Sequence, residues 1–210
     1  MRTKGAAATI VLIAAAAAAN EPSKWERLFS AEGGPAVHAS ARYRDAAGNE
    51  HRLELWRTPR ALRRDTDEKL AMIVERRHGS DDEYHVVQLG QNGRAYDVSR
   101  DSLYRMGSFP EWSQLATMLT RPAGELRIDG GAEATTTAGA CRWYEVTRES
   151  ARERICWSRA MRLPLVIERW VSGAWARTVT VERAKVERIA ATVFHPQFDV
   201  AHIDIDRDLD

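Results

Sequence analysis

Apolar and polar residues alternate with a period of two along most of the chain, a pattern typical of β-strands with one buried face. In His51–Trp56, Leu53 and Leu55 point to one face and Arg52 and Glu54 to the other. The same pattern predicts strands over Ala39–Arg44, His51–Trp56, Ala61–Asp67, Leu70–Arg77, Tyr84–Leu89, Arg94–Ser99, Ser102–Met106, Glu125–Ile128, Arg142–Thr147, Glu153–Ser158, Pro164–Val171, Arg177–Val186 and Ala191–Phe194. Short turns join most of these segments, with an Asn-Gly signal within 90–93 and a Gly/Ala/Thr-rich linker expected over Gly130–Gly139. The chain is therefore expected to be mainly β (α+β), with an antiparallel sheet.

One segment has the period of a helix instead. Trp112, Leu115, Ala116 and Leu119 recur at helical spacing between Pro110 and Pro122. A helix with one apolar stripe buries that stripe against another layer. We expect it to cover the concave side of a curved sheet.

The first 19 residues differ from the rest and predict a signal peptide. Arg2 and Lys4 precede an uncharged, Ala-rich run from Ala6 to Ala19, and small residues stand at 17–19. The run is shorter than the roughly 20 residues that a membrane-spanning helix needs, so no stable membrane anchor is expected. Residues 1–19 are assigned to the signal peptide and 20–210 to a single β-rich domain that is exported and soluble.

Both cysteines lie in the expected mature part, and an even number in an exported chain favours a disulfide between Cys141 and Cys156. Direct pairing of these two residues across a hairpin predicts a register. Glu145 then lies opposite Arg152, and Trp143 opposite Arg154. The first pair has opposite charges and the second is cation–aromatic, and both are favourable across strands.

Charge and motifs exclude several function classes. Lys and Arg number 31 and Asp and Glu 30, so no global field attracts nucleic acid. The chain has no Gly-x-Ser-x-Gly motif, no phosphate-binding glycine loop and no His or Cys grouping with metal spacing. We expect a protein that is not an enzyme and uses no metal or cofactor. The row Asp204, Asp206, Asp208 and Asp210 is interpreted as the charged outer face of an edge strand rather than a calcium site.

Two segments resemble LolA/LolB-type proteins, a superfamily of periplasmic lipoprotein carriers and lipid-sensing regulators. They are Thr192–Val200 (TVFHPQFDV) and Cys156–Ile167 (CWSRAMRLPLVI), which leads through Leu163-Pro164-Leu165 into a late strand. The resemblance implies an unclosed β-barrel with a covering helix that shelters an acyl chain. It extends in layout over most of residues 20–210.

The resemblance implies a non-catalytic periplasmic binder or carrier of an apolar ligand, either a lipid or the acyl chains of a lipoprotein. Two alternatives remain open: an envelope regulatory protein with a protein partner, and a periplasmic hydrolase. The expected pocket lies beneath the helix, against the early strands. Its candidate residues are Trp112, Leu115, Met118, Leu119, Trp56, Leu53 and Leu55.

The signal-peptide pattern yields the first testable prediction. We expect the exported protein to begin near Asn20, because the small residues at 17–19 suit a signal peptidase. N-terminal sequencing of protein recovered from the cell envelope checks this, and an intact Met1 would contradict it.

Overall fold

The computed structural model describes residues 23–45, 47–76, 84–89, 94–105, 112–149, 151–195 and 202–204. The strands are β1 Val37–Arg44, β2 Glu50–Arg57, β3 Ala61–Thr66, β4 Lys69–Arg76, β5 Tyr84–Leu89, β6 Ala95–Ser99, β7 Arg127–Thr136, β8 Gly139–Arg148, β9 Ala151–Ser158, β10 Leu163–Val171, β11 Ala174–Val186 and β12 His202–Asp204. The predictions for residues 1–22, for the turn at 90–93, for 196–200 and for Asp206, Asp208 and Asp210 lie outside the described residues.

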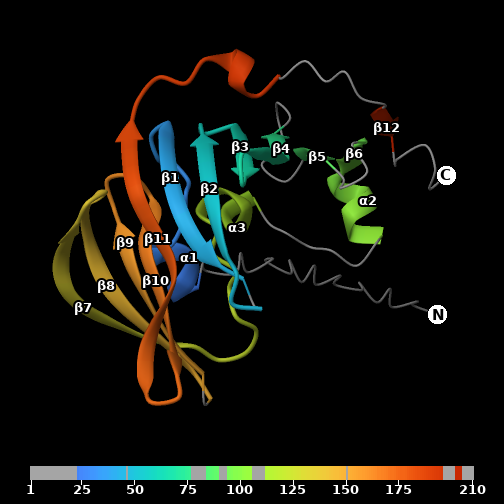
Figure 1. The fold of residues 1–210 in the computed structure, drawn as a ribbon. Helices are drawn as coiled ribbons and strands as arrows, with labels where there is room; N and C mark the ends of the chain where they lie inside the picture. Colours follow the sequence, from blue (N-terminus) through green and yellow to red (C-terminus); the bar gives the residue numbers. More distant parts are fainter. Residues whose placement is uncertain are drawn as a thin grey trace, which may run out of the picture.

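All these strands belong to one sheet, in the order β12-β6-β5-β4-β3-β2-β1-β11-β10-β9-β8-β7 (Figure 1). Strands β1 to β11 pair antiparallel, whereas β12 pairs parallel with β6. The first and last strands in this order do not pair with each other, so the sheet is not closed. The mainly β class and the unclosed antiparallel sheet are confirmed.

Two meanders and the added strand β12 make up the sheet. Strands β1 to β6 follow one another in chain order, as do β7 to β11. The two halves meet where β1 pairs with β11, from Val37↔Val186 to Tyr43↔Val179, with a bulge at Ser40/Ala41.

The helices are short: α1 Lys24–Leu28, α2 Arg100–Arg105, α3 Trp112–Thr117 and the 3₁₀ turn η1 Ala191–Val193. The strands predicted over Ser102–Met106 and Ala191–Phe194 are therefore wrong. At α2, the Ser99 hydroxyl accepts a hydrogen bond from the Ser102 amide at 3.2 Å, a contact typical of a helix start. A few alternating residues cannot distinguish a single turn of helix from a short strand.

The linker expected over Gly130–Gly139 is also wrong, because these residues form most of β7 and its turn into β8. The register shifts between Gly130 and Glu133, which marks a bulge. A Cβ added at Gly131 would lie 3.4 Å from the Trp143 carbonyl oxygen, a tight contact. Gly131 therefore lies close to the backbone of β8 at this bulge, whereas a Cβ at Gly130 would make only ordinary contacts.

The bent sheet has an inner face, on which α1 and α3 lie (Figure 1). Phe29 of α1 contacts Tyr144 and Trp157 edge-to-face, with ring centroids 5.5 and 5.4 Å apart. Trp112 and Ala116 of α3 join a second buried cluster that includes the inward residues of β1 to β5. The two helices thus fill the curve of the sheet.

The outer face of β8 to β11 has an alternating row of tryptophans and arginines. Arg154 lies 4.9 Å from the Trp143 ring and 4.7 Å from Trp175, and Arg152 lies 5.3 Å from Trp175 and 4.9 Å from Trp170. Each cation–π contact contributes about 0.5–1 kcal/mol where it is partly exposed. The row therefore ties four strands together.

Cys141 and Cys156 form a disulfide, as predicted, with a Cα–Cα distance of 5.3 Å. The predicted register is wrong by two residues: Trp143 lies opposite Cys156, and Glu145 opposite Arg154. The disulfide therefore joins diagonal neighbours on one face of the hairpin. The Glu145–Arg152 ion pair at 2.7 Å and the Arg154–Trp143 contact still form, because long side chains reach diagonal partners.

Removal of this disulfide should lower stability without changing the fold. The double variant Cys141→Ala/Cys156→Ala should lose about 3 kcal/mol of unfolding free energy, the value expected for a fifteen-residue loop. Urea unfolding measures the loss. The parent protein kept in reductant should match the variant, and equal midpoints for the oxidised parent and the variant would contradict the prediction.

Candidate functional site

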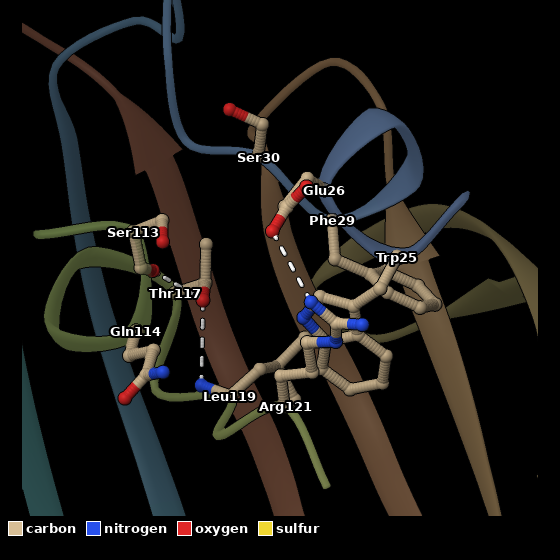
Figure 2. Close-up of a pocket in the computed structure, with 9 residues that line it drawn as sticks. All are labelled: Trp25, Glu26, Phe29, Ser30, Ser113, Gln114, Thr117, Leu119 and Arg121. Carbon is tan, nitrogen blue, oxygen red and sulfur yellow. Dashed lines mark hydrogen bonds and ion pairs between the residues drawn. The ribbon is translucent and has the colours of Figure 1, made fainter. Parts of the chain in front are cut away.

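Between α1 and α3, on the inner side of the sheet, lies a cleft of about 80 Å³ (Figure 2). Its floor is apolar and its rim polar. The lining residues are Trp25, Glu26, Phe29, Ser30, Ser113, Gln114, Thr117, Leu119 and Arg121.

Helix α1 supplies one wall of the cleft. Ser23 caps it through a reciprocal pair of hydrogen bonds: the Glu26 amide donates to the Ser23 hydroxyl, and the Ser23 amide donates to the Glu26 carboxylate at 2.6 Å. These bonds lower the pKa of Glu26. The resulting carboxylate pairs with Arg121 at 3.4 Å across the cleft rim (Figure 2).

Helix α3 supplies the opposite wall and ends abruptly. The Thr117 hydroxyl donates to the Ser113 carbonyl at 2.6 Å and accepts from the Leu119 amide at 3.3 Å. Met118 then adopts a left-handed backbone with φ of +59°, which stops the helix before Leu119. This turn directs Leu119 toward Trp25 and Phe29, in a different cluster from Trp112.

Arg57, at the end of β2, holds α3 in place. It is 2% exposed, and its guanidinium donates to the carbonyls of Ala116 at 2.8 Å, Arg162 at 2.7 Å and Met161. Burial lowers its pKa to about 10, so it remains a cation at neutral pH. One side chain therefore connects β2, α3 and the β9–β10 turn.

Sequence reasoning missed Arg57, although a signal was present. The predicted strand ended at Trp56, yet Arg57 has the same phase as Leu53 and Leu55, and all three are buried. A charged residue in phase with the apolar residues of a strand indicates a buried polar contact.

Arg64 is a second inward arginine that sequence reasoning missed. It lies between Leu55 and Met72 in the register of β2, β3 and β4. Burial lowers its pKa, and its Nε atom is buried without a hydrogen-bond partner. The inner face is therefore less uniformly apolar than its strand pattern suggested.

The structure separates the predicted pocket residues. Leu53 and Leu55 are buried on the inner face, in the cluster that also holds Trp112, and Leu115 and Met118 pack against this cluster. Of the seven candidates, only Leu119 lines the cleft.

The expectation that Trp56 faces the same pocket is wrong. Consecutive strand residues point to opposite faces, so Trp56 lies on the outer face. There it stacks on His38 with ring centroids 4.9 Å apart, while Arg63 lies 5.2 Å from its ring.

No group of three or more His, Cys, Asp or Glu side chains in the described part of the chain is placed to hold a metal ion. No helix among the described segments is long and apolar enough to cross a membrane.

No protein-family model matches the chain, and no curated protein matches its sequence. Among solved structures, an uncharacterised conserved protein from Thermus thermophilus aligns with a TM-score of 0.49 and 12% identity, covering 85% of this chain and 93% of its own. MucB aligns with a TM-score of 0.49 and 14% identity, covering 82% of this chain. The Pseudomonas aeruginosa MucA/MucB complex aligns with a TM-score of 0.46 and 14% identity.

The chain spans 61% of the MucB chain and 59% of the matching chain in the MucA/MucB complex. All three TM-scores lie below one half, and no identity exceeds 14%. These likenesses therefore say nothing about what this chain binds.

Replacement of Arg57 should loosen α3. Arg57→Met leaves three carbonyls without their donor, so the unfolding free energy should fall by about 1–3 kcal/mol. Amide hydrogen exchange in 112–119 should speed up relative to the parent protein, and by more than exchange in β8 and β9. Arg57→Lys is the matched control: it keeps the charge but lacks the planar fork, so it should restore only part of the loss. Stability and exchange equal to those of the parent in Arg57→Met would contradict this role.

Proposed function

We propose that the chain is a non-catalytic binding protein that takes up an apolar ligand, a lipid or the acyl chain of a lipoprotein, on the inner face of its open sheet. The observation that carries the proposal is how α3 is held. This six-residue helix lies outside the strand ladders and is attached by apolar packing and by Arg57. A cover of this kind can move while the sheet remains intact.

The size of the cleft determines how a ligand would enter. At about 80 Å³ it is far smaller than the roughly 300 Å³ of ordinary small-molecule pockets. An acyl chain therefore needs α3 to move away from α1.

The energies permit this movement. Movement of α3 breaks the one Arg57 hydrogen bond that reaches it, at the Ala116 carbonyl, for about 1 kcal/mol, and the Arg76–Trp112 cation–π contact. Each buried methylene of a ligand returns about 0.8 kcal/mol, so a long chain offsets these contacts and the apolar packing of Trp112 and Ala116 that α3 gives up. Short chains would bind poorly, and affinity would rise with length.

We further propose that the protein works in the periplasm. The Cys141–Cys156 disulfide supports an oxidising compartment, where such bonds form and persist. The signal-peptide pattern of residues 1–19 favours the same location.

The small volume of the cleft favours a second candidate, an envelope regulatory protein that recognises a protein partner. The floor of Trp25, Phe29 and Leu119, with the Glu26–Arg121 pair at its rim, suits one apolar side chain of a partner without any movement of α3. Analysis of what co-purifies separates the candidates: acyl species support the first, and a protein partner supports the second.

The leading proposal predicts a chain-length dependence. Titration of the protein 20–210 with uncharged monoacylglycerols of increasing length, followed by tryptophan fluorescence, should show affinity rising about fourfold per methylene. Gln114→Trp fills the cleft between α1 and α3 and should abolish this response. Asp101→Trp, the same change at an exposed position of α2, should leave it unchanged. A flat response across all lengths would overturn the lipid proposal and leave the protein partner as the leading candidate.

A further inference from the structure

A second hollow, of about 330 Å³, lies where the β8–β9 and β10–β11 hairpins end. We call this hollow the hairpin-end groove. Its volume falls in the range of ordinary small-molecule sites, about 300–1,000 Å³. The lining residues are Pro122, Val146, Arg148, Ala151, Arg152, Glu153, Arg169, Trp170 and Val171.

The floor of the groove is apolar, and one of its apolar side chains is unusually exposed to solvent. Val171 is 53% exposed and has the inner-face phase of Val146, whereas the Trp170 ring lies on the outer face against Arg152 and Trp175. Val146 and Pro122 extend the apolar lining. A ligand with an apolar group would cover surface that water now contacts.

The charges of the groove are unbalanced, with three arginines and one carboxylate in its lining. Arg169 pairs with Glu153 at 3.3 Å, and Arg152 pairs with Glu145 at 2.7 Å while it stacks on Trp170. Arg148 has no carboxylate or hydrogen-bond partner among the described residues. One arginine fork therefore remains free to bind an anion.

We propose that the hairpin-end groove binds a small amphipathic anion, a carboxylate or phosphate monoester attached to an apolar group. Arg148 would bind the anionic head through its paired N–H donors. Val171, Val146 and Pro122 would contact the apolar part. Glu153 in the lining and exposed Glu149 beside Arg148 disfavour polyanions, which need several free cations. The site is open as it stands and needs no movement of α3, so it does not rest on the lipid cover proposed above.

The test uses four probes with the same ten-carbon chain: decanoate, decyl phosphate, decyl glucoside and decyltrimethylammonium, all below their micelle concentrations. Calorimetric titration of the protein 20–210 should show binding of both anions, with decyl glucoside at least about tenfold weaker and the cation weaker still. Acetate, which has the head without the chain, should not bind measurably. Equal affinity for decanoate and decyl glucoside would overturn the proposal.

Three variants locate the site. Arg148→Gln should weaken decanoate binding about tenfold and leave decyl glucoside binding unchanged. Arg188→Gln, at an exposed arginine after β11, is the matched control and should leave both unchanged. Gln114→Trp, which blocks the α1–α3 cleft, should keep the preference for anions. An unchanged decanoate affinity in Arg148→Gln, or loss of the preference in Gln114→Trp, would overturn the assignment to the groove.

Discussion

The inner architecture depends on one buried cation. Apolar packing has no direction, so it cannot by itself set where the six-residue helix α3 sits on a curved sheet. Helices this short are not stable alone. Arg57 supplies the direction, because its fork reaches carbonyls of α3 and of the β9–β10 turn at once. A single carboxylate partner would hold Arg57 to one segment. Three carbonyls from α3 and the β9–β10 turn instead fix the orientation of α3 relative to that turn.

The sheet was predictable because its signal repeats. Each strand carries several alternating residues, so errors at single positions average out, and β5 begins and ends as expected at Tyr84 and Leu89. Elements of one turn carry too few residues for that, which explains the errors at α2 and η1. The predicted register of the β8–β9 hairpin was wrong for another reason. Two cysteines can bond directly or diagonally across strands, and sequence alone does not separate the two.

The candidate site was predictable only in outline. The apolar stripe of 112–119 indicated a helix against the sheet, but the left-handed turn at Met118 sends Leu119 to another cluster than Trp112. That turn depends on local hydrogen bonds of Thr117, which no periodicity reveals. The second wall comes from α1, far away in the sequence and too short to show a pattern.

The topology has a consequence for how the chain folds. Within each meander every strand pairs with its neighbour in sequence, so most of the sheet forms through short loops that close at little entropic cost. Two pairings are exceptions: the parallel β12–β6 pair (His202↔Ala95), and the seam from Val37↔Val186 to Tyr43↔Val179, which joins positions about 140 residues apart. Non-local pairing of this kind slows folding. Arg57 crosses the same divide, from β2 to a turn of the second meander. Each meander can therefore assemble as a separate unit, and α3 acquires its fixed position only when the seam closes and brings the two units together.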